Sequence, residues 1–408
     1  MKFLILVPDG CGDRPIPSLG GRTALEAADM KNINALARES ETGLVKTIPD
    51  GVAPGSDAAN LAVMGFDPVA HLTGRSPLEA VSMGIEMSDT DVAFRANLVT
   101  LEGDGPYEDL IIKDHSSGDI ASADARVLME MIERELGGDG VHFYPGVSYR
   151  HAMIASEGGE DCRLTPPHDV LTRRAGDYLP QGAGAERLEG LMRRSHELLR
   201  SHPINLERVR RGLNPANSIW IWGQGRKPRL PSFSEKYGID GAVVAAVDLI
   251  KGIGLCAGLS APEVPGATGT LLTDFGGKAR AAIEAFGSGK DFVYIHVEAP
   301  DECAHQGDLP GKLEAMRLID EKVFKPVVDY LEGTGEAYRV LVVPDHKTPM
   351  EIRTHSSEPV PFVLFDSENR LPEDEGKAFS ESAGERGGFY GSGAALADRF
   401  FGSPSSES

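Results

Sequence analysis

Cysteine is scarce in this chain of 408 residues, which contains four: Cys11, Cys162, Cys256 and Cys303. They lie far apart, and none forms a CxxC pair of the kind found in zinc and redox sites. A disulfide framework is therefore not indicated. Scattered cysteines favour reduced thiols and hence a cytoplasmic protein.

Long hydrophobic runs are also missing. No apolar stretch approaches the roughly 20 residues that span a bilayer, and the longest ones, 3–7 and 340–343, have the length of single strands. Met1 and Lys2 lead directly into the first of these runs without a small-residue cleavage site, so we expect no secretory signal. No membrane partner is predicted.

Positive charge is in deficit. Lys and Arg number 41 against 62 Asp and Glu, which gives a formal net charge of −21. This balance argues against a nucleic acid as partner, because phosphate backbones bind basic surfaces. Small anionic substrates stay compatible with it, since a local Arg/Lys pocket can lie in an acidic protein.

Strand-like and helix-like segments alternate at both ends of the chain, which indicates an α/β fold with a mostly parallel sheet flanked by helices. The middle of the chain has longer amphipathic helices and a Pro/Gly-rich stretch. We therefore predict a core domain made of residues 1–89 and 231–408. Residues 90–230 are predicted to form a smaller inserted α+β domain.

Acidic residues follow three of the expected core strands: Asp9, Asp301 and Asp345. Ligands of open parallel sheets bind outside the carboxyl ends of the strands, so these carboxylates are expected to converge. Any one of them alone would be read as a turn residue or a helix cap.

Histidines accompany two of these aspartates. His305 follows Asp301 by one helical turn, His346 is adjacent to Asp345, and His355 follows nine residues later. Carboxylate oxygen together with imidazole nitrogen suits Mn²⁺ or Zn²⁺. The pattern predicts a metal site.

Ser56 lies in the run Pro54-Gly55-Ser56-Asp57, just before a helix-like segment. It could be a plain N-cap. It could also be a nucleophile, since a helix N-terminus favours an anion and a nearby metal would activate the hydroxyl. The predicted metal site favours the nucleophile.

Together these motifs resemble the cofactor-independent phosphoglycerate mutases, and within them the shorter, archaeal-type branch of the alkaline-phosphatase-like metalloenzyme superfamily. The resemblance runs over nearly the whole chain and is carried by Pro8-Asp9-Gly, Pro54-Gly-Ser56-Asp, Ala299-Pro-Asp301-Glu-Cys-Ala-His305-Gln-Gly-Asp308, Pro344-Asp345-His346-Lys-Thr-Pro and Arg353-Thr-His355. It implies an alkaline-phosphatase-like core and two divalent metal ions, with Mn²⁺ preferred to Zn²⁺, Co²⁺ or Mg²⁺. It also implies how the ligands divide: one ion is held by Asp9, Ser56, Asp345 and His346, and the other by Asp301, His305 and His355.

The middle region also resembles a bacterial subgroup of this family that has been proposed to act as homoserine kinases. The motifs that carry this second resemblance are Asp114-His115-Ser-Ser-Gly118, Gly146-Val-Ser-Tyr-Arg150-His151, Thr165-Pro-Pro-His168-Asp169 and Pro215-Ala-Asn217-Ser-Ile-Trp220. The metal motifs are shared and do not separate the two activities.

A phosphorylated, carboxylated substrate needs cationic partners. Arg suits both groups better than Lys, because its guanidinium can donate two parallel hydrogen bonds to a phosphate or a carboxylate. Arg95 and Lys251 lie in the short segments, 93–97 and 248–252, that best match the family pattern. They are predicted to be catalytic together with Ser56. The predicted substrate-binding residues are His115, Arg150, Arg75 and Arg226. Each of the cationic candidates could instead be a surface charge.

The resemblance implies interconversion of 3-phosphoglycerate and 2-phosphoglycerate through a phosphoserine at Ser56, and so a role in glycolysis and gluconeogenesis. Two alternatives stay open: a homoserine kinase-like phosphotransferase, and a metal-binding regulatory protein without catalysis. The oligomeric state is not predicted.

Overall fold

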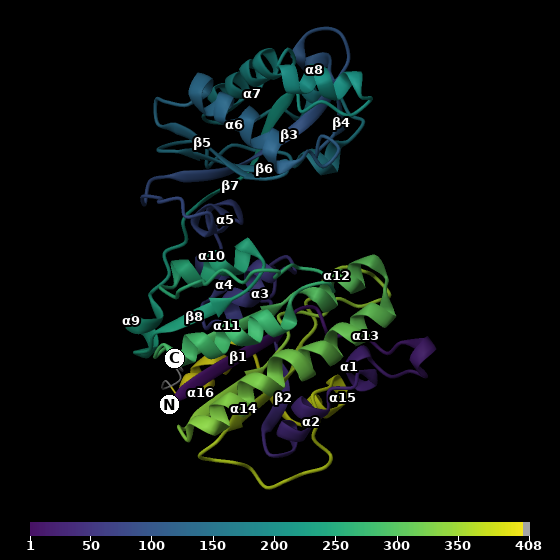
Figure 1. Ribbon diagram of the computed structural model, residues 1–408, viewed down its shortest axis with the longest axis vertical. Coiled ribbons are helices and arrows are strands. Elements are labelled where there is room, and N and C mark those ends of the chain that lie inside the picture. Colours follow the sequence, from purple (N-terminus) through teal and green to yellow (C-terminus); the bar gives the residue numbers. More distant parts are fainter. Residues whose placement is uncertain (403–408) are drawn as a thin grey trace. The chain divides into compact units, whose positions relative to one another are not determined.

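The computed structural model describes residues 1–402. The chain forms two compact units (Figure 1). The core unit consists of Met1–Leu72 and the described residues from Arg229 onward, and the inserted unit is Thr73–Pro228. Within residues 1–402, no helix is both long and apolar enough to cross a bilayer.

The structure draws the first domain boundary earlier than the sequence did, at residue 73 rather than 90. The segment between these positions contains α5 (Ser76–Ser82), which packs on strands of the inserted unit. Glu79 of this helix pairs with Arg95, and Ala80 joins a small apolar cluster with Ala93. These contacts attach the segment to the inserted unit. The second boundary, at 229, lies close to the expected 231.

The core unit is built on a seven-stranded sheet in the order β12-β2-β11-β10-β1-β9-β8. Its strands are β1 (Lys2–Pro8), β2 (Glu41–Val45), β8 (Gly241–Val244), β9 (Phe292–Val297), β10 (Tyr338–Val342), β11 (Val360–Asp366) and β12 (Gly388–Tyr390). β1 pairs in parallel with β9 and β10, β8 with β9, and β12 with β2, whereas β11 is antiparallel to both neighbours. The predicted α/β fold with a mostly parallel sheet is confirmed.

Helices cover both faces of this sheet. They are α1 (Ala24–Ala27), α2 (Lys31–Arg38), α3 (Ser56–Val63), α4 (Pro68–His71), α9 (Phe233–Tyr237), α10 (Asp248–Cys256), α11 (Phe275–Gly287), α12 (Ala299–Gln306), α13 (Leu309–Leu318), α14 (Lys325–Thr334), α15 (Glu381–Gly384) and α16 (Gly393–Phe401), with a 3₁₀ turn η1 (Pro17–Leu19) and a π-helical turn η5 (Ile319–Phe324). Successive side chains of a strand point to opposite faces. Leu4 and Leu6 accordingly pack in the cluster that contains residues of α2, α11, η5 and α14, while Phe3 meets Phe400 of α16 on the other face.

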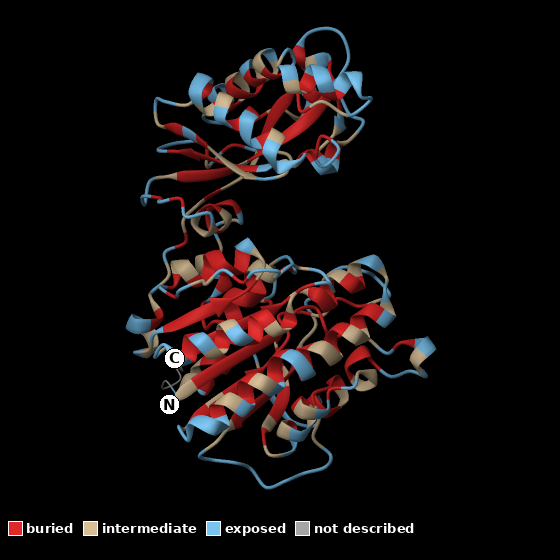
Figure 2. Cartoon of the chain, viewed as in Figure 1, coloured by how far each residue is buried: buried red, intermediate tan, exposed pale blue. Residues whose placement is uncertain are grey.

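β1 is an interior strand of the sheet, and its burial agrees with this place. Its residues from Leu4 to Val7 are fully buried, and every residue of β9 is buried. Continuous apolar runs of this kind are typical of parallel strands covered on both faces. Figure 2 shows the strands as buried and the outward sides of the helices as exposed.

The strand order brings three chain segments to one edge of the core sheet. β1 and β10 end shortly before Asp9 and Asp345, and β9 ends just before α12, which carries Asp301. Because β1, β9 and β10 are parallel neighbours, their carboxyl ends meet at the same edge. This edge is where the sequence predicts the site.

The inserted unit is an α+β unit, as predicted. Its five-stranded sheet has the order β4-β3-β6-β5, with β7 paired to β3, and all its strand pairs are antiparallel. The strands are β3 (Val92–Glu102), β4 (Ile111–Asp114), β5 (Val141–Val147), β6 (Arg150–Ala155) and β7 (Ser218–Arg226). Besides α5, the helical elements are η2 (Tyr107–Asp109), α6 (Ser122–Leu136), η3 (Pro167–Val170), η4 (Ala175–Tyr178), α7 (Ala185–Leu199) and α8 (Pro203–Arg210). Phe94, Leu128, Met192 and Trp220 belong to its own apolar core.

Candidate active site

Asp9, Asp345 and His346 form the first cluster of possible metal ligands, and all three are buried. Nε2 of His346 lies 3.6 Å from Oδ1 of Asp9 and 3.5 Å from Oδ2 of Asp345. Two carboxylates and one imidazole thus point at a common position. This geometry suits a divalent cation of the Mn²⁺ or Zn²⁺ type.

Asp301, His346 and His355 form the second cluster. Oδ1 of Asp301 lies 3.6 Å from Nε2 of His355, and Oδ2 lies 3.1 Å from Nε2 of His305. His305 and His355 approach each other to 3.0 Å between their Nε2 atoms. The structure therefore brings together all the aspartates and histidines that the sequence proposed as ligands. His346, assigned from the resemblance to one ion, contributes to both clusters.

The electrostatics of these clusters call for a cation. Burial, reinforced by the charges of Asp345 and Asp301, raises the pKa of Asp9 well above its usual range. Among the described residues, Oδ1 of Asp9 is buried without a hydrogen-bond partner. Burial and then the Asp301 charge raise the pKa of Glu298 to about 7. A divalent cation would relieve this repulsion, so the residues present fit one.

The histidines respond to the carboxylates in different ways. Burial lowers the pKa of His346, which keeps its imidazole in the neutral form that binds metals. The hydrogen bond with Asp301 raises the pKa of the less buried His305 to about 9. Burial, the largest single influence, acts to raise the pKa of Asp301. Hydrogen bonds with His305 and His355, together with the charge of His346 and the hydrogen bond from Thr348, lower it overall.

Ser56 begins α3, and its Oγ lies 3.2 Å from Nε2 of His346. Gly55 holds the N-cap position, and no side chain caps this helix. The hydroxyl of Ser56 is therefore directed at the metal-ligand cluster instead of serving as a helix cap. This placement agrees with the nucleophile interpretation of the sequence.

Sequence reasoning missed two polar residues that hold this arrangement, Asn60 and Tyr294. Asn60 is fully buried in α3 and donates to Oδ2 of Asp345 at 2.9 Å. Tyr294 of β9 donates to Oδ1 of Asn60 at 2.5 Å. One signal in the sequence could have identified Asn60: it is an asparagine in an otherwise apolar helical segment, one turn after Ser56. A buried amide without a hydrogen-bond partner is costly, so a partner was to be expected.

A buried ion pair supports the second cluster and was also missed. Lys312 is fully buried, and its Nζ donates to Oδ2 of Asp13 at 2.9 Å and to the carbonyl of Thr348 at 2.9 Å. The hydroxyl of Thr348 in turn donates to Asp301. In the sequence Lys312 is one lysine of a helical segment, and nothing local marks it as buried.

Lys251 lies in α10 of the core unit and is nearly buried. Its Nζ is 2.9 Å from Oε1 of Glu263, whose side chain is exposed. A second buried lysine, Lys278, donates to the carbonyl of His296 at 2.8 Å. Burial lowers the pKa of Lys278 to about 8, with a smaller contribution in the same direction from Lys251.

The remaining predicted substrate residues belong to the inserted unit. Arg95 forms a two-pronged pair with Glu79, and its guanidinium lies 4.7 Å from the centre of the Trp222 ring. Arg226 pairs with Glu160 and donates to backbone carbonyls. These two arginines are thus held by internal partners.

Arg150 and Arg75 are exposed, unlike Arg95 and Arg226. The guanidinium of Arg150 lies over the ring of Tyr149, at 5.5 Å from its centre. Tyr149 contacts His115 edge-on, at 5.6 Å between ring centres. Arg150 and His115 therefore both contact the ring of Tyr149. Arg75 is the N-cap residue of α5.

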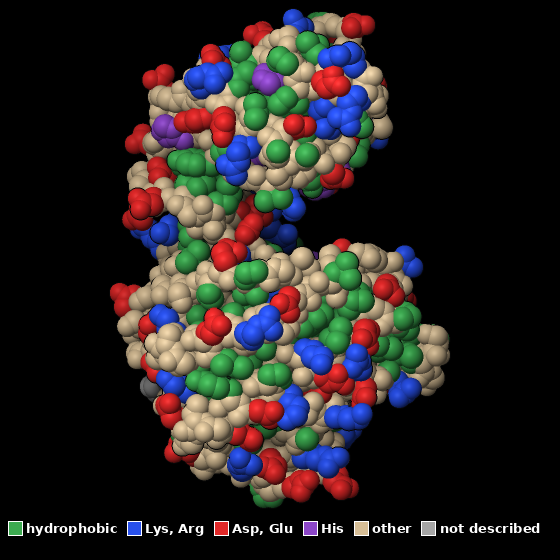
Figure 3. Space-filling model, viewed as in Figure 1, with side chains coloured by type: hydrophobic (Ala, Val, Ile, Leu, Met, Phe, Trp, Pro, Cys, Tyr) green, Lys and Arg blue, Asp and Glu red, His purple; other side chains and the backbone are tan. Residues whose placement is uncertain are grey.

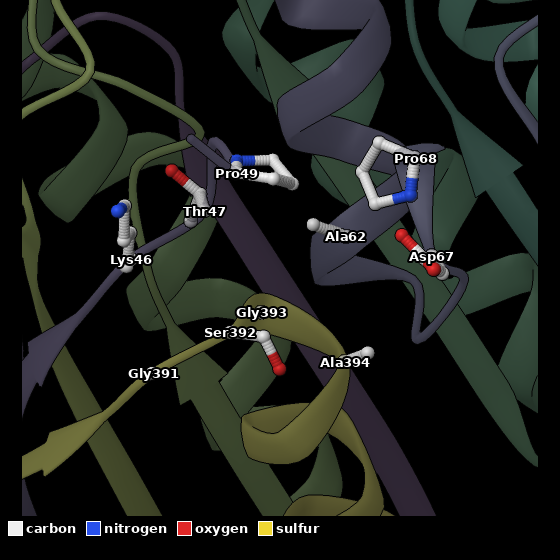
Figure 4. A pocket seen from close by; sticks show the side chains of 10 residues that line it. All are labelled: Lys46, Thr47, Pro49, Ala62, Asp67, Pro68, Gly391, Ser392, Gly393 and Ala394. Atoms are coloured by element: carbon white, nitrogen blue, oxygen red, sulfur yellow. The ribbon is translucent and has the colours of Figure 1, made fainter. Parts of the chain in front are cut away.

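Acidic and basic side chains are intermingled over the face of the core unit that Figure 3 shows. The core unit also contains a cavity of about 340 Å³ (Figure 4). It is lined by Lys46, Thr47, Pro49, Ala62, Asp67, Pro68, Gly391, Ser392, Gly393 and Ala394. None of the predicted site residues lines it, but the Thr47 hydroxyl donates to the backbone carbonyl of Asp345 at 2.5 Å.

The chain is similar to known proteins over most of its length. A family model described as 2,3-bisphosphoglycerate-independent phosphoglycerate mutase matches residues 37–205. A mutase of that name from Methanosarcina acetivorans is 46% identical over 374 residues, covering 91% of this chain and 92% of the relative. A probable mutase of the same type from Geobacter sulfurreducens is 48% identical over 369 residues, covering 90% and 91%.

Two solved structures have similar folds. A protein from Pyrococcus horikoshii is 27% identical with a TM-score of 0.82, covering 100% of this chain and 99% of that one. The cofactor-independent phosphoglycerate mutase from Thermoplasma acidophilum is 24% identical with a TM-score of 0.68, covering 98% and 99%. The latter likeness bears on the fold alone.

Proposed function

Because the chain belongs to the family of 2,3-bisphosphoglycerate-independent phosphoglycerate mutases, we propose that it interconverts 3-phosphoglycerate and 2-phosphoglycerate through a phosphoserine at Ser56. The enzyme is an isomerase, an intramolecular phosphotransferase. One observation carries the role of Ser56: its hydroxyl lies 3.2 Å from His346 inside a buried cluster of carboxylates and imidazoles.

The two alternatives are less well supported. Relatives that are 45–48% identical are named phosphoglycerate mutases, which favours the mutase over a homoserine kinase-like enzyme. A regulatory protein without catalysis would have no need of a serine hydroxyl aimed at the cluster.

The proposed cofactor is a pair of divalent ions, with Mn²⁺ preferred. Asp9, Asp345 and His346 would hold one ion, with Ser56 beside it. The other would be held by Asp301, His305 and His355, with His346 also in reach. When bound, such ions supply Lewis acidity and neutralise charge on the phosphoryl oxygens.

The chain's own residues account for the transfer in two steps. Ser56 Oγ attacks phosphorus, the bond from phosphorus to the C3 oxygen of 3-phosphoglycerate breaks, and the serine proton ends on that oxygen. The C2 oxygen of the bound glycerate then attacks the phosphoserine, and its proton returns to Ser56. The first backbone N–H groups of α3 favour the phosphoryl anion at this position.

The small phosphorylated substrate also needs a cation or a hydrogen-bond donor for its carboxylate. Arg150 and His115 are the best supported candidates in the inserted unit, because Arg150 is exposed and both contact Tyr149. Arg95, Arg226 and Arg75 stay predictions, as does the catalytic role of Lys251. A cytoplasmic role in glycolysis and gluconeogenesis belongs to the same proposal.

An enolase-coupled assay tests the function. The purified protein with Mn²⁺ is expected to convert 3-phosphoglycerate to 2-phosphoglycerate, while a parallel assay with ATP and homoserine gives no phosphohomoserine. Phosphorylation of homoserine without mutase turnover would overturn the proposal in favour of the kinase.

A further inference from the structure

We infer that Asn60 is a positioning residue that fixes Ser56 and the carboxylate of Asp345 relative to each other. The inference rests on the proposed function for the role of Ser56, but its geometry is independent of the substrate. Asn60 touches neither the hydroxyl of Ser56 nor a metal-facing histidine in the hydrogen bonds that the structure gives it.

The side-chain amide of Asn60 joins two segments that are far apart in the sequence. Nδ2 donates to the backbone carbonyl of Ser56 at 2.8 Å and to Oδ2 of Asp345 at 2.9 Å. An amide nitrogen carries two hydrogens, so both are used. The same amide group is therefore hydrogen-bonded both to the first residue of α3 and to a carboxylate of the first metal-ligand cluster.

The orientation of this amide is fixed by Tyr294, which is fully buried and donates to Oδ1 of Asn60 at 2.5 Å. Burial raises the pKa of the Tyr294 hydroxyl well above its ordinary value, so it stays a donor. Turning the amide over would place its oxygen against the Asp345 carboxylate and its nitrogen against the tyrosine donor. Tyr294 thus holds Asn60 in the one orientation that serves Asp345.

The rest of the Asp345 carboxylate is held by the backbone. Its Oδ1 accepts from the N–H of Gly10 at 3.2 Å and from the N–H of His346 at 2.9 Å. Asn60 is the side-chain donor to the other oxygen. Partners of this kind orient a metal ligand, and removing them typically costs about 10–100-fold in metal affinity or activity.

The inserted unit offers a matched control in Asn205, which is also buried. Its Nδ2 donates to the carbonyls of Leu199 and Ala216 at 2.9 and 2.8 Å, and its Oδ1 accepts from the N–H of Ala216 at 2.8 Å. This is the same number of hydrogen bonds in the same degree of burial, but none of them reaches the candidate site. Asn205→Ala therefore measures the structural cost of losing a buried asparagine.

The experiment compares Asn60→Ala, Tyr294→Phe and Asn205→Ala in the full-length protein. Three quantities are measured: melting temperature, Mn²⁺ affinity by calorimetry, and kcat and KM in the enolase-coupled assay at saturating Mn²⁺. Asn60→Ala is expected to weaken Mn²⁺ binding by about 10–100-fold and to lower kcat by about 100-fold with little change in KM. Tyr294→Phe should show the same pattern about tenfold more weakly, and Asn205→Ala should lower the melting temperature only.

Wild-type Mn²⁺ affinity and kcat in both Asn60→Ala and Tyr294→Phe would overturn the inference. So would losses in Asn205→Ala that match those in Asn60→Ala, because the effect would then be structural. If Asn60→Ala fails to fold, the Mn²⁺ affinity and kcat of Tyr294→Phe alone decide whether the inference holds. If the wild-type protein has no mutase activity, the proposed function fails, and the Mn²⁺ affinities still decide the role of Asn60.

Discussion

The two units place their candidate functional groups in opposite ways. In the core unit, Asp9, Asp345 and His346 are buried, and Asp345 accepts hydrogen bonds from the N–H of Gly10 and from Asn60, which are distant in the sequence. In the inserted unit, Arg150 is exposed and rests on an aromatic ring, and Arg95 is taken up by an internal ion pair. The core unit therefore holds its candidate groups inside the protein, while the inserted unit exposes at least one candidate cation, Arg150, to solvent.

Removing the nucleophile is the largest change available in the core unit. Ser56→Ala should lower mutase turnover by about 10⁴-fold or more, as loss of a nucleophile does in other covalent mechanisms. The melting temperature should stay at its wild-type value, because Ser56 carries no helix-capping bond, and at least one metal ion should stay bound. Substantial residual turnover in the enolase-coupled assay would contradict the phosphoserine route.

Breaking the buried ion pair between Lys312 and Asp13 tests how much the buried charges of the core unit contribute to its stability. Lys312→Met leaves the carboxylate of Asp13 buried without its cation, which should cost about 3–5 kcal/mol in the free energy of unfolding. Denaturant unfolding measures this cost. The control is Lys325→Met, which removes an exposed pair with Asp329 and should cost less than about 1 kcal/mol. Equal costs for the two variants would show that burial of Lys312 does not matter.

Exposed cations of the inserted unit should affect turnover without affecting stability. Arg150→Ala should lower kcat/KM by about 10–100-fold, since a charged hydrogen bond to substrate is lost, while metal content and melting temperature stay unchanged. Arg95→Ala should lower both turnover and melting temperature, because its ion pair with Glu79 is lost as well. The exposed Arg134, which pairs with its neighbour Glu135, supplies the control variant Arg134→Ala. Wild-type turnover in Arg150→Ala would remove that residue from the substrate site.

The smallest expected effect is a pH dependence of the metal-free protein. The pKa of His305 is raised from 6.5 to about 9 by its hydrogen bond with Asp301. Its contribution to stability is therefore fully present below pH 6.5 and is lost as the pH rises through about 9. The difference in melting temperature between the chelated wild type and chelated His305→Gln should shrink across this window. A difference that grows with pH would contradict the assignment.

Mn²⁺ affinity should move in the opposite direction. A metal ion binds the neutral imidazole, so protons compete with it at low pH. The wild-type affinity, measured by calorimetry, should therefore increase from pH 6.5 toward pH 9.

Part of the predicted metal-ligand set was accessible from the sequence, because Asp9, Asp301 and Asp345 each follow an expected strand and the ends of parallel strands meet at one edge. The division of the ligands between two ions came from the family resemblance. Asn60, Tyr294 and Lys312 were not accessible in this way. Their partners lie on segments hundreds of residues away, and only the packed fold tells a buried, satisfied polar group from a surface one. The first domain boundary was misplaced for a similar reason, because α5 is assigned to the inserted unit by tertiary contacts.

The most direct test of the central claim is to find the phosphoryl group during turnover. The Mn²⁺-loaded protein is mixed with 3-phosphoglycerate, quenched in acid and digested, and the peptide that contains Ser56 is analysed by mass spectrometry. The account predicts a phosphoryl group on Ser56 in the wild type, none after exhaustive chelation, and none in Ser56→Ala. Mutase turnover with the phosphoryl group on another residue, or with no phosphorylated protein at any time, would contradict it.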